Sequence, residues 1–157
     1  ERPAHRLHGL VWEGSDEAAA GGAIRAVIAE MRAFSDRRVA LWKSPIVMLS
    51  WNDRPGAFRC LVGIAPEEGE AAPEGFSAVD LPEMRFAAAW CGPLGGSGEE
   101  AVLRQYGRML DWLKGSGYRR DTTRFHQREE YPHDVDLAQP HTLRLMLPVA
   151  PEAGEGR

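Results

Sequence analysis

The 157-residue sequence lacks the features that mark several large classes of protein. No apolar run approaches the roughly 20 residues that a membrane-spanning helix needs, and no signal-peptide core is present. The two cysteines, Cys60 and Cys91, lie far apart without metal-ligand spacing, so we expect buried free thiols in a reducing cytoplasm. The five histidines form no HExxH-type cluster, and we expect neither a metal nor a cofactor.

The sequence also lacks a strong charge of either sign. Its formal net charge is -4, and its arginines are scattered along the chain, so direct contact with DNA is not expected. The chain begins at Glu1 with ERPAHR, which allows an upstream helix-turn-helix, although no such motif lies within these residues. Any contact with DNA is therefore expected to come through an attached or partner DNA-binding domain.

The sequence does contain a repeated pattern. LVWEG at 10–14 is matched by AAWCG at 88–92, an offset of 78 residues that aligns Trp12 with Trp90. The same offset relates apolar positions in the segments that follow. A repeat with one constant offset indicates an internal duplication.

An acidic segment that contains Pro and Gly and no aromatic residue separates the two copies at 66–75, and its composition is typical of a linker. We therefore expect one domain over residues 1–157, built from internal repeats at about 7–65 and 76–149.

Each repeat predicts a strand, a helix and two further strands. In the first helix, Ile24, Val27, Ile28 and Met31 recur at helical spacing. In the second helix, the predicted stripe is Leu103, Tyr106, Leu110 and Leu113, and we expect Tyr106 and Trp112 to belong to the core. The predicted strands are 7–13, 45–52, 57–65, 76–81, 84–91, 124–131 and 141–149.

This element order predicts an α+β fold of tandem, pseudo-two-fold β-α-β-β modules. Its antiparallel sheet carries two helices on one face. The other face is then expected to be free to hold a ligand in a cleft between the modules.

Several segments, in this order, resemble the GyrI-like effector-binding domain of multidrug-responsive bacterial transcription regulators. They are SWNDRPGAFRCLVGIA, LPEMRFAAAWCGP, YGRMLDWLKGSGY, RFHQREEYP and LRLMLPV, and the resemblance covers about residues 7–149. It implies a cleft at the module junction that binds bulky apolar, often cationic, molecules beside a buried glutamate. It also implies a sensor attached to a regulator of the AraC or MerR type. The segment GPLGGSG at 92–98 departs from the family pattern, and we expect it to form a flexible rim of the cleft.

Two adjacent glutamates in QREEY are candidates for the buried carboxylate. Strand alternation over 124–131 places Phe125, Gln127, Glu129 and Tyr131 on one face. Glu129 also matches the family's Glu-x-Tyr position, so we expect Glu129 to bind the ligand and Glu130 to be solvated. The alternative is a half-buried Glu129 that is paired with Arg124 or Arg144.

Aromatic residues complete the predicted site. The repeat offset places Trp51 on Glu129, so both are expected to face one cleft, together with Trp12, Trp90, Phe125 and Tyr131. The alternative for the tryptophans is ordinary core packing.

Three functions fit this interpretation. The leading one is a small-molecule sensor for lipophilic or cationic ligands. The second is a hydrolase of cyclopropanoid electrophiles, implied by some GyrI-like proteins, in which Glu129 and Tyr131 would be catalytic. The third is an interaction with gyrase, for which the sequence supplies no specific feature.

Overall fold

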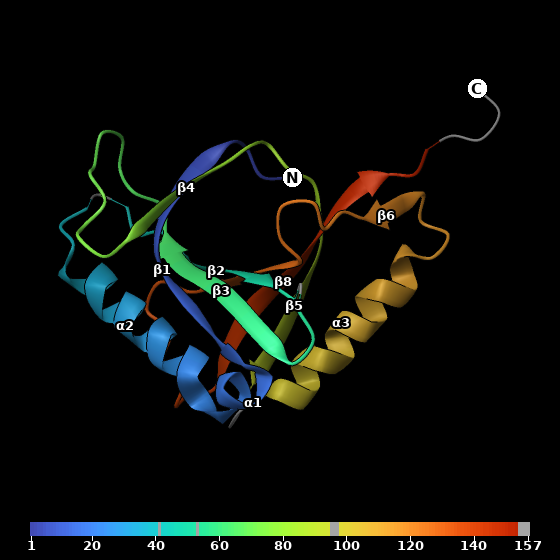
Figure 1. Ribbon diagram of the computed structural model, residues 1–157, viewed down its shortest axis with the longest axis horizontal. Helices are drawn as coiled ribbons and strands as arrows, with labels where there is room; N and C mark the ends of the chain where they lie inside the picture. The colour runs from blue at the N-terminus through green and yellow to red at the C-terminus, as the bar shows by residue number, and fades with distance from the viewer. Residues whose placement is uncertain (41, 53, 95–97, 154–157) are drawn as a thin grey trace.

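The protein folds around one open antiparallel sheet (Figure 1). The computed structural model describes residues 1–40, 42–52, 54–94 and 98–153, and within these ranges the sheet has eight strands. The main order is β4-β1-β3-β2-β7-β8-β5, and the short β6 pairs with the end of β8. The strands are β1 (His5–Ser15), β2 (Ile46–Trp51), β3 (Ala57–Ile64), β4 (Ser77–Leu81), β5 (Phe86–Leu94), β6 (Tyr118–Arg120), β7 (Gln127–Tyr131) and β8 (His141–Pro151).

The two halves of the sheet have the same internal order. From the centre outwards, the first half runs β2, β3, β1 and the second runs β7, β8, β5. The halves meet where β2 pairs antiparallel with β7, with Ile46 opposite Tyr131 and Met48 opposite Glu129. This is the tandem β-α-β-β arrangement that the sequence predicts.

Two long helices, α2 (Ile24–Arg37) and α3 (Glu99–Leu113), cover the same face of the sheet, which we call the helix face (Figure 1). Helix α2 packs on the first half of the sheet and α3 on the second. A single turn, α1 (Asp16–Ala18), and a π-helical segment, η1 (Ala19–Ala23), precede α2. Gly22 has φ 110°, a conformation that favours glycine, so the chain changes direction there before α2 begins.

The predicted apolar stripe is confirmed for α2, and on α3 it is confirmed at Tyr106 and Leu113 but wrong at Leu103 and Leu110. Ile28 and Met31 of α2 are buried against the sheet. On α3, Leu103 and Leu110 are 70% and 39% exposed, and Trp112 is exposed as well. Among the residues of α3 whose burial is described, Tyr106, Met109 and Leu113 are buried. Apolar residues of α3 can be grouped into a stripe with spacings of three or four residues in more than one way. The pattern alone therefore does not determine which face of α3 packs against the sheet.

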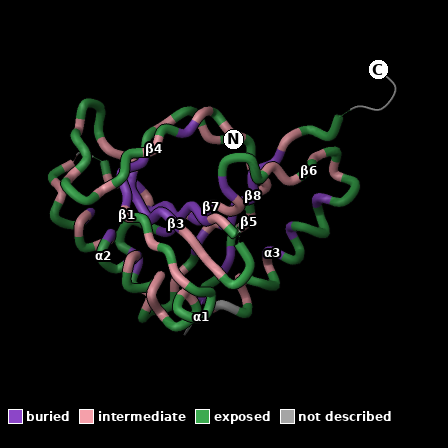
Figure 2. The backbone as a smooth tube through the Cα atoms, viewed as in Figure 1, coloured by how far each residue is buried: buried purple, intermediate pink, exposed green. Residues whose placement is uncertain are grey.

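Both faces of the sheet are buried, and buried residues run through its centre (Figure 2). In β2, Met48 faces the helices, whereas Val47 and Leu49 face a second apolar cluster on the opposite side, the second face. The N-terminal segment is held near this cluster by a two-way backbone bridge between Arg2 and Met84. The second face is therefore packed with side chains, and the expectation that it is free for a ligand is wrong.

Candidate functional site

A cavity of about 530 Å³ lies on the helix face, between α2 and α3 and over the central strands. Its volume is within the usual range for small-molecule sites, about 300–1,000 Å³. Most of its lining is apolar and includes Ile24, Ile28, Met48, Phe58, Leu94 and Leu143. Because both halves of the sheet contribute, the cleft between modules is present, but it opens on the helix face.

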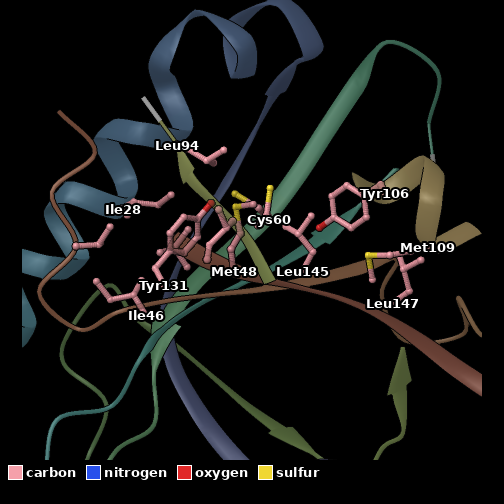
Figure 3. Close-up of a cluster of buried hydrophobic side chains, with 14 of the residues drawn as sticks. Ile28, Ile46, Met48, Cys60, Leu94, Tyr106, Met109, Tyr131, Leu145 and Leu147 are labelled. Carbon is pink, nitrogen blue, oxygen red and sulfur yellow. The ribbon is translucent and has the colours of Figure 1, made fainter. Parts of the chain in front are cut away.

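Glu129 lies at the floor of this cavity, near the middle of β7. The alternation of β7 places Gln127, Glu129 and Tyr131 together on the cavity, as the sequence predicts. Glu129 is 8% exposed, and two phenols bind its two carboxylate oxygens. The hydroxyl of Tyr106, on α3, donates to Oε1 at 2.9 Å, and that of Tyr131 donates to Oε2 at 2.7 Å. Figure 3 shows the two rings on opposite sides of the cluster, each with its hydroxyl directed inwards.

The electrostatic state of Glu129 follows from this environment. Burial raises the pKa of Glu129, and the hydrogen bonds from Tyr131 and Tyr106 offset the effect only in part. Burial and the nearby Glu129 charge also raise the pKa values of both phenols, which therefore remain protonated donors. Among the described residues, neither Arg124 nor Arg144 pairs with Glu129, so the paired alternative is wrong.

The neighbouring Glu130 points to the second face and is not solvated, contrary to the sequence prediction. Its side chain is 11% exposed and accepts hydrogen bonds from Arg2 at 2.8 Å and Arg128 at 2.9 Å. Burial alone would raise the pKa of Glu130, but Arg2 and Arg128 outweigh burial and lower it. The ion pair between Glu130 and Arg2 therefore holds the N-terminal segment against the sheet.

Phe125 and Trp51 lie on the second face and do not line the cavity. Phe125 precedes β7, so the alternation that placed it beside Glu129 does not reach it. Phe125 is 1% exposed, and its ring lies edge-on to the Trp51 ring with 6.4 Å between the two ring centres. In the sheet, Glu129 lies opposite Met48. Trp51 and Glu129 lie on opposite faces, so the repeat offset of 78 residues that equates them does not extend into β2 and β7.

Trp90 and Trp12 also lie outside the cavity lining, for different reasons. Trp90 is 68% exposed, and the Arg144 guanidinium lies 5.5 Å from its ring centre. Trp12 is partly buried in the core of the helix face, with its ring 6.5 Å from that of Phe58. Since Phe58 lines the cavity, Trp12 supports the cavity wall from behind.

The sequence of residues 1–150 matches the profile of the family described as the GyrI-like small molecule binding domain. The chain belongs to the GyrI-like family. No curated protein sequence matches it significantly.

Solved structures share the fold of this GyrI-like domain. SAV2435, in a structure with bound tetraphenylphosphonium, has a TM-score of 0.67 and 13% identity over 95% of this chain and 90% of that chain. The C-terminal domain of EcmrR has a TM-score of 0.64 and 13% identity, and the match covers 96% and 94% of the two chains. In an EcmrR–DNA complex, the match has a TM-score of 0.66 and 12% identity and covers 96% of this chain but 55% of that chain.

A hydrolase from Listeria innocua also has the GyrI-like fold. Its TM-score is 0.50 at 16% identity, over 96% of this chain and 93% of that chain. At these identities the similarities establish a common fold.

Sequence reasoning missed Tyr106, Met48 and Phe58 in this GyrI-like domain. The sequence predicts Tyr106 as a core residue of α3, yet its hydroxyl reaches the floor of the cavity. The available signal was a hydroxyl on an otherwise apolar helical stripe, since a buried tyrosine usually has a hydrogen-bond partner. Met48 and Phe58 carry no such signal, because apolar residues of strands line cores and cavities alike.

The mouth of the cavity carries charges of both signs. Asp16 lies in the single turn of α1, and Arg25 projects from the first turn of α2. The predicted rim at 92–98 is described only in part, because residues 95–97 lie outside the described ranges. Leu94, immediately before them, lines the cavity.

Cys60 and Cys91 are buried free thiols, as the sequence predicts. Burial and the Glu129 charge raise the pKa of Cys60 to about 12, and burial raises the pKa of Cys91, so neither is an activated nucleophile. Over the described ranges, no group of three or more His, Cys, Asp or Glu side chains could hold a metal ion. The helices in the same ranges include none long and apolar enough to span a membrane.

Proposed function

We propose that this domain binds bulky lipophilic cations in the cavity, with Glu129 as the counter-charge. One observation carries the proposal: a carboxylate is buried among apolar walls, and its hydrogen-bond partners in the described structure are two neutral phenols. An ionised carboxylate in such a site has lost the solvation of water without gaining a positive partner. A bound cation would supply that partner.

The ligand-contacting residues in this proposal are Glu129, Tyr131 and Tyr106, with Phe58 and Met48 as apolar walls. Aromatic rings add cation–π attraction of about 0.5–2 kcal/mol each when a cation lies over their faces. The structural similarity to SAV2435, which was solved with tetraphenylphosphonium, supports a ligand of this class.

We further infer that the domain is the effector-binding part of a bacterial transcription regulator of the AraC or MerR type, acting in the cytoplasm. Contact with DNA would come from an attached or partner domain. The similarity to the C-terminal domain of EcmrR, a protein also solved in complex with DNA, supports this role. A reporter assay with the complete gene product tests it: the ligand should change transcription, and Glu129→Gln should abolish the response.

Calorimetric titration with tetraphenylphosphonium tests the binding proposal directly. Glu129→Gln should weaken binding about tenfold or more, because a charge-assisted interaction in a buried site contributes about 1.5–3 kcal/mol. Glu74→Gln, an exposed glutamate, is the matched control and should leave the affinity unchanged. Triphenylphosphine oxide, a neutral aromatic probe, should not distinguish wild type from Glu129→Gln. Equal affinity of wild type and Glu129→Gln for the cation would exclude the proposal.

Hydrolysis of cyclopropanoid electrophiles is the second candidate function. The 2.7 Å hydrogen bond from Tyr131 to Glu129 favours it, because it places a phenol beside a carboxylate of raised pKa. Against it, both carboxylate oxygens already accept a phenol, so a water molecule must compete for Glu129 as a base. Incubation with a cyclopropanoid substrate distinguishes the functions, since quantitative recovery of the intact compound excludes hydrolysis.

A further inference from the structure

A second hollow, the α2 groove, runs between α2 and the loop 132–140, which connects β7 to β8. Its volume is about 390 Å³. Its apolar side chains come from one face of α2 and from the loop: Ile28, Ala29, Ala33, Val135, Leu137 and Ala138. The two alanines of α2 are exposed and small, which leaves a trough along the helix.

The α2 groove is continuous with the cavity that holds Glu129. Arg25, Ile28 and Leu137 line both hollows, so the two meet at these three side chains. Ile28 is buried at the base of this junction, and Leu137 is half-buried. A flexible chain that leaves the cavity at this point would enter the groove.

A hydrogen bond crosses the junction between the cavity and the α2 groove. Arg25 Nη2 donates to the Leu137 carbonyl oxygen at 2.8 Å, and this bond is exposed to solvent. Seven residues further along α2, Arg32 Nη1 donates to the Val135 carbonyl oxygen at 3.0 Å in a partly buried bond. The loop is thus fixed at Val135, whose side chain is buried. At Leu137 the loop is held to α2 by the exposed hydrogen bond from Arg25. The long Arg25 side chain can swing into water, where its hydrogen bond is replaced at little cost.

The charges of the groove balance. Arg25 and Arg32 are matched by Asp36 and Asp136, and Arg32 forms an i,i+4 ion pair with Asp36 at 3.5 Å. A segment of ligand in the groove therefore meets apolar side chains without an excess of either charge, which suits an uncharged aliphatic chain.

We propose that the α2 groove is a tail subsite that binds the aliphatic chain of a cationic amphiphile, while the cationic head lies beside Glu129. This inference rests on the proposed function and narrows it to a ligand class: a cation that carries one flexible alkyl chain. Arg25 and Leu137 are the residues that determine how far the chain extends.

A series of alkyltrimethylammonium ions of increasing chain length, used below their micelle concentrations, tests the tail subsite. Once the chain is longer than the cavity, each added methylene should raise the affinity of the wild type about two- to fourfold, the range for partial to full burial of one methylene. Ala33→Phe fills the groove and does not touch the cavity, because Ala33 lines only the groove. This variant should remove the dependence on chain length and leave tetraphenylphosphonium binding unchanged.

Ala26→Phe is the matched control, because Ala26 is exposed on the same helix and lines neither hollow. It should behave as the wild type, which separates blocking of the groove from a general effect of phenylalanine on α2. If tetraphenylphosphonium binds but the affinity does not rise with chain length, or if Ala33→Phe leaves the rise intact, the tail subsite is wrong. If tetraphenylphosphonium itself fails to bind, the proposed function is wrong.

Discussion

The hydroxyl of Tyr106 lies 2.9 Å from Oε1 of Glu129 and connects helix α3 to the central strand of the sheet. Tyr106 therefore links the protonation state of the Glu129 carboxylate to helix α3, which packs on the outer strands β5 and β6. A cation that ionises Glu129 would strengthen this hydrogen bond, because a charged acceptor binds a donor more strongly than a neutral one.

Binding of a lipophilic cation should depend on pH through Glu129. The pKa of Glu129 in the free protein is raised above 4.5, and a bound cation would lower it again. The affinity should therefore rise with pH up to the raised pKa of the free protein and then level off. Below that pKa it should fall by about tenfold per pH unit. Titrations of tetraphenylphosphonium across this range check the prediction, and Glu129→Gln should give a flat profile.

Removal of either phenol should shift this profile to higher pH. Tyr106→Phe and Tyr131→Phe each delete a donor that stabilises the ionised carboxylate, so the pKa of Glu129 should rise further. A hydrogen bond to a charged group contributes about 1.5–3 kcal/mol, which corresponds to a displacement of the profile by about one pH unit or more. Tyr118→Phe, which removes a hydroxyl bonded to the exposed Arg85, should leave the profile in place. An undisplaced profile in both core variants would show that the phenols do not tune Glu129.

As pH rises, the contribution of Glu129 to the stability of the ligand-free protein should fall, whereas the affinity for a cation should rise. Because the folded-state pKa is raised, the stability that Glu129 contributes is fully present below the unfolded value. It is lost as pH rises through the folded pKa. Relative to wild type, Glu129→Gln should therefore gain stability as pH rises, by about 1.4 kcal/mol for each unit by which the pKa is raised. Urea unfolding at a series of pH values measures this difference, and a constant difference would contradict the prediction.

Glu130 should show the reverse behaviour although it is the next residue. Its pKa is lowered, so the stability that it contributes is present above the unfolded value and is lost as pH falls through the folded pKa. Glu130→Ala leaves Arg128, whose side chain is 5% exposed, without its carboxylate partner and should cost about 3–5 kcal/mol at neutral pH. Asp80→Asn removes an exposed ion pair with Arg6 and should have no measurable effect on unfolding. A Glu130→Ala protein as stable as wild type would show that the N-terminal segment is not held by this cluster.

The contribution of each aromatic residue should follow its position relative to the cavity. Phe58→Ala removes part of the cavity wall and should weaken tetraphenylphosphonium binding several-fold. Trp90→Ala removes an exposed ring that lies outside the cavity lining and should leave the affinity unchanged. Loss of affinity in Trp90→Ala, with the fold intact by circular dichroism, would place the ligand elsewhere.

The sequence predicts the two long helices and seven of the eight described strands, because each has its own periodicity, but it does not predict the short β6. The stripe of α2 and the alternation of β7 needed only local spacing, and both are confirmed at Ile28, Met31 and Glu129. Glu129 was also separable from Glu130 on this basis, since side chains of adjacent strand residues point to opposite faces. The error at Phe125 has the same origin, because alternation was extended beyond the point where β7 begins.

The composition and periodicity of the chain thus determined an antiparallel sheet with two helices and one carboxylate facing an apolar site. Only the tertiary structure decided that the cavity lies on the helix face, that Tyr106 completes the Glu129 pair, and that Glu130 is an ion-paired anchor for Arg2. These facts depend on which residues far apart in the chain come together. Tyr106 and Glu129 meet because α3 packs on the sheet with one particular rotation about its own axis. An apolar stripe with spacings of three and four residues is compatible with more than one such rotation.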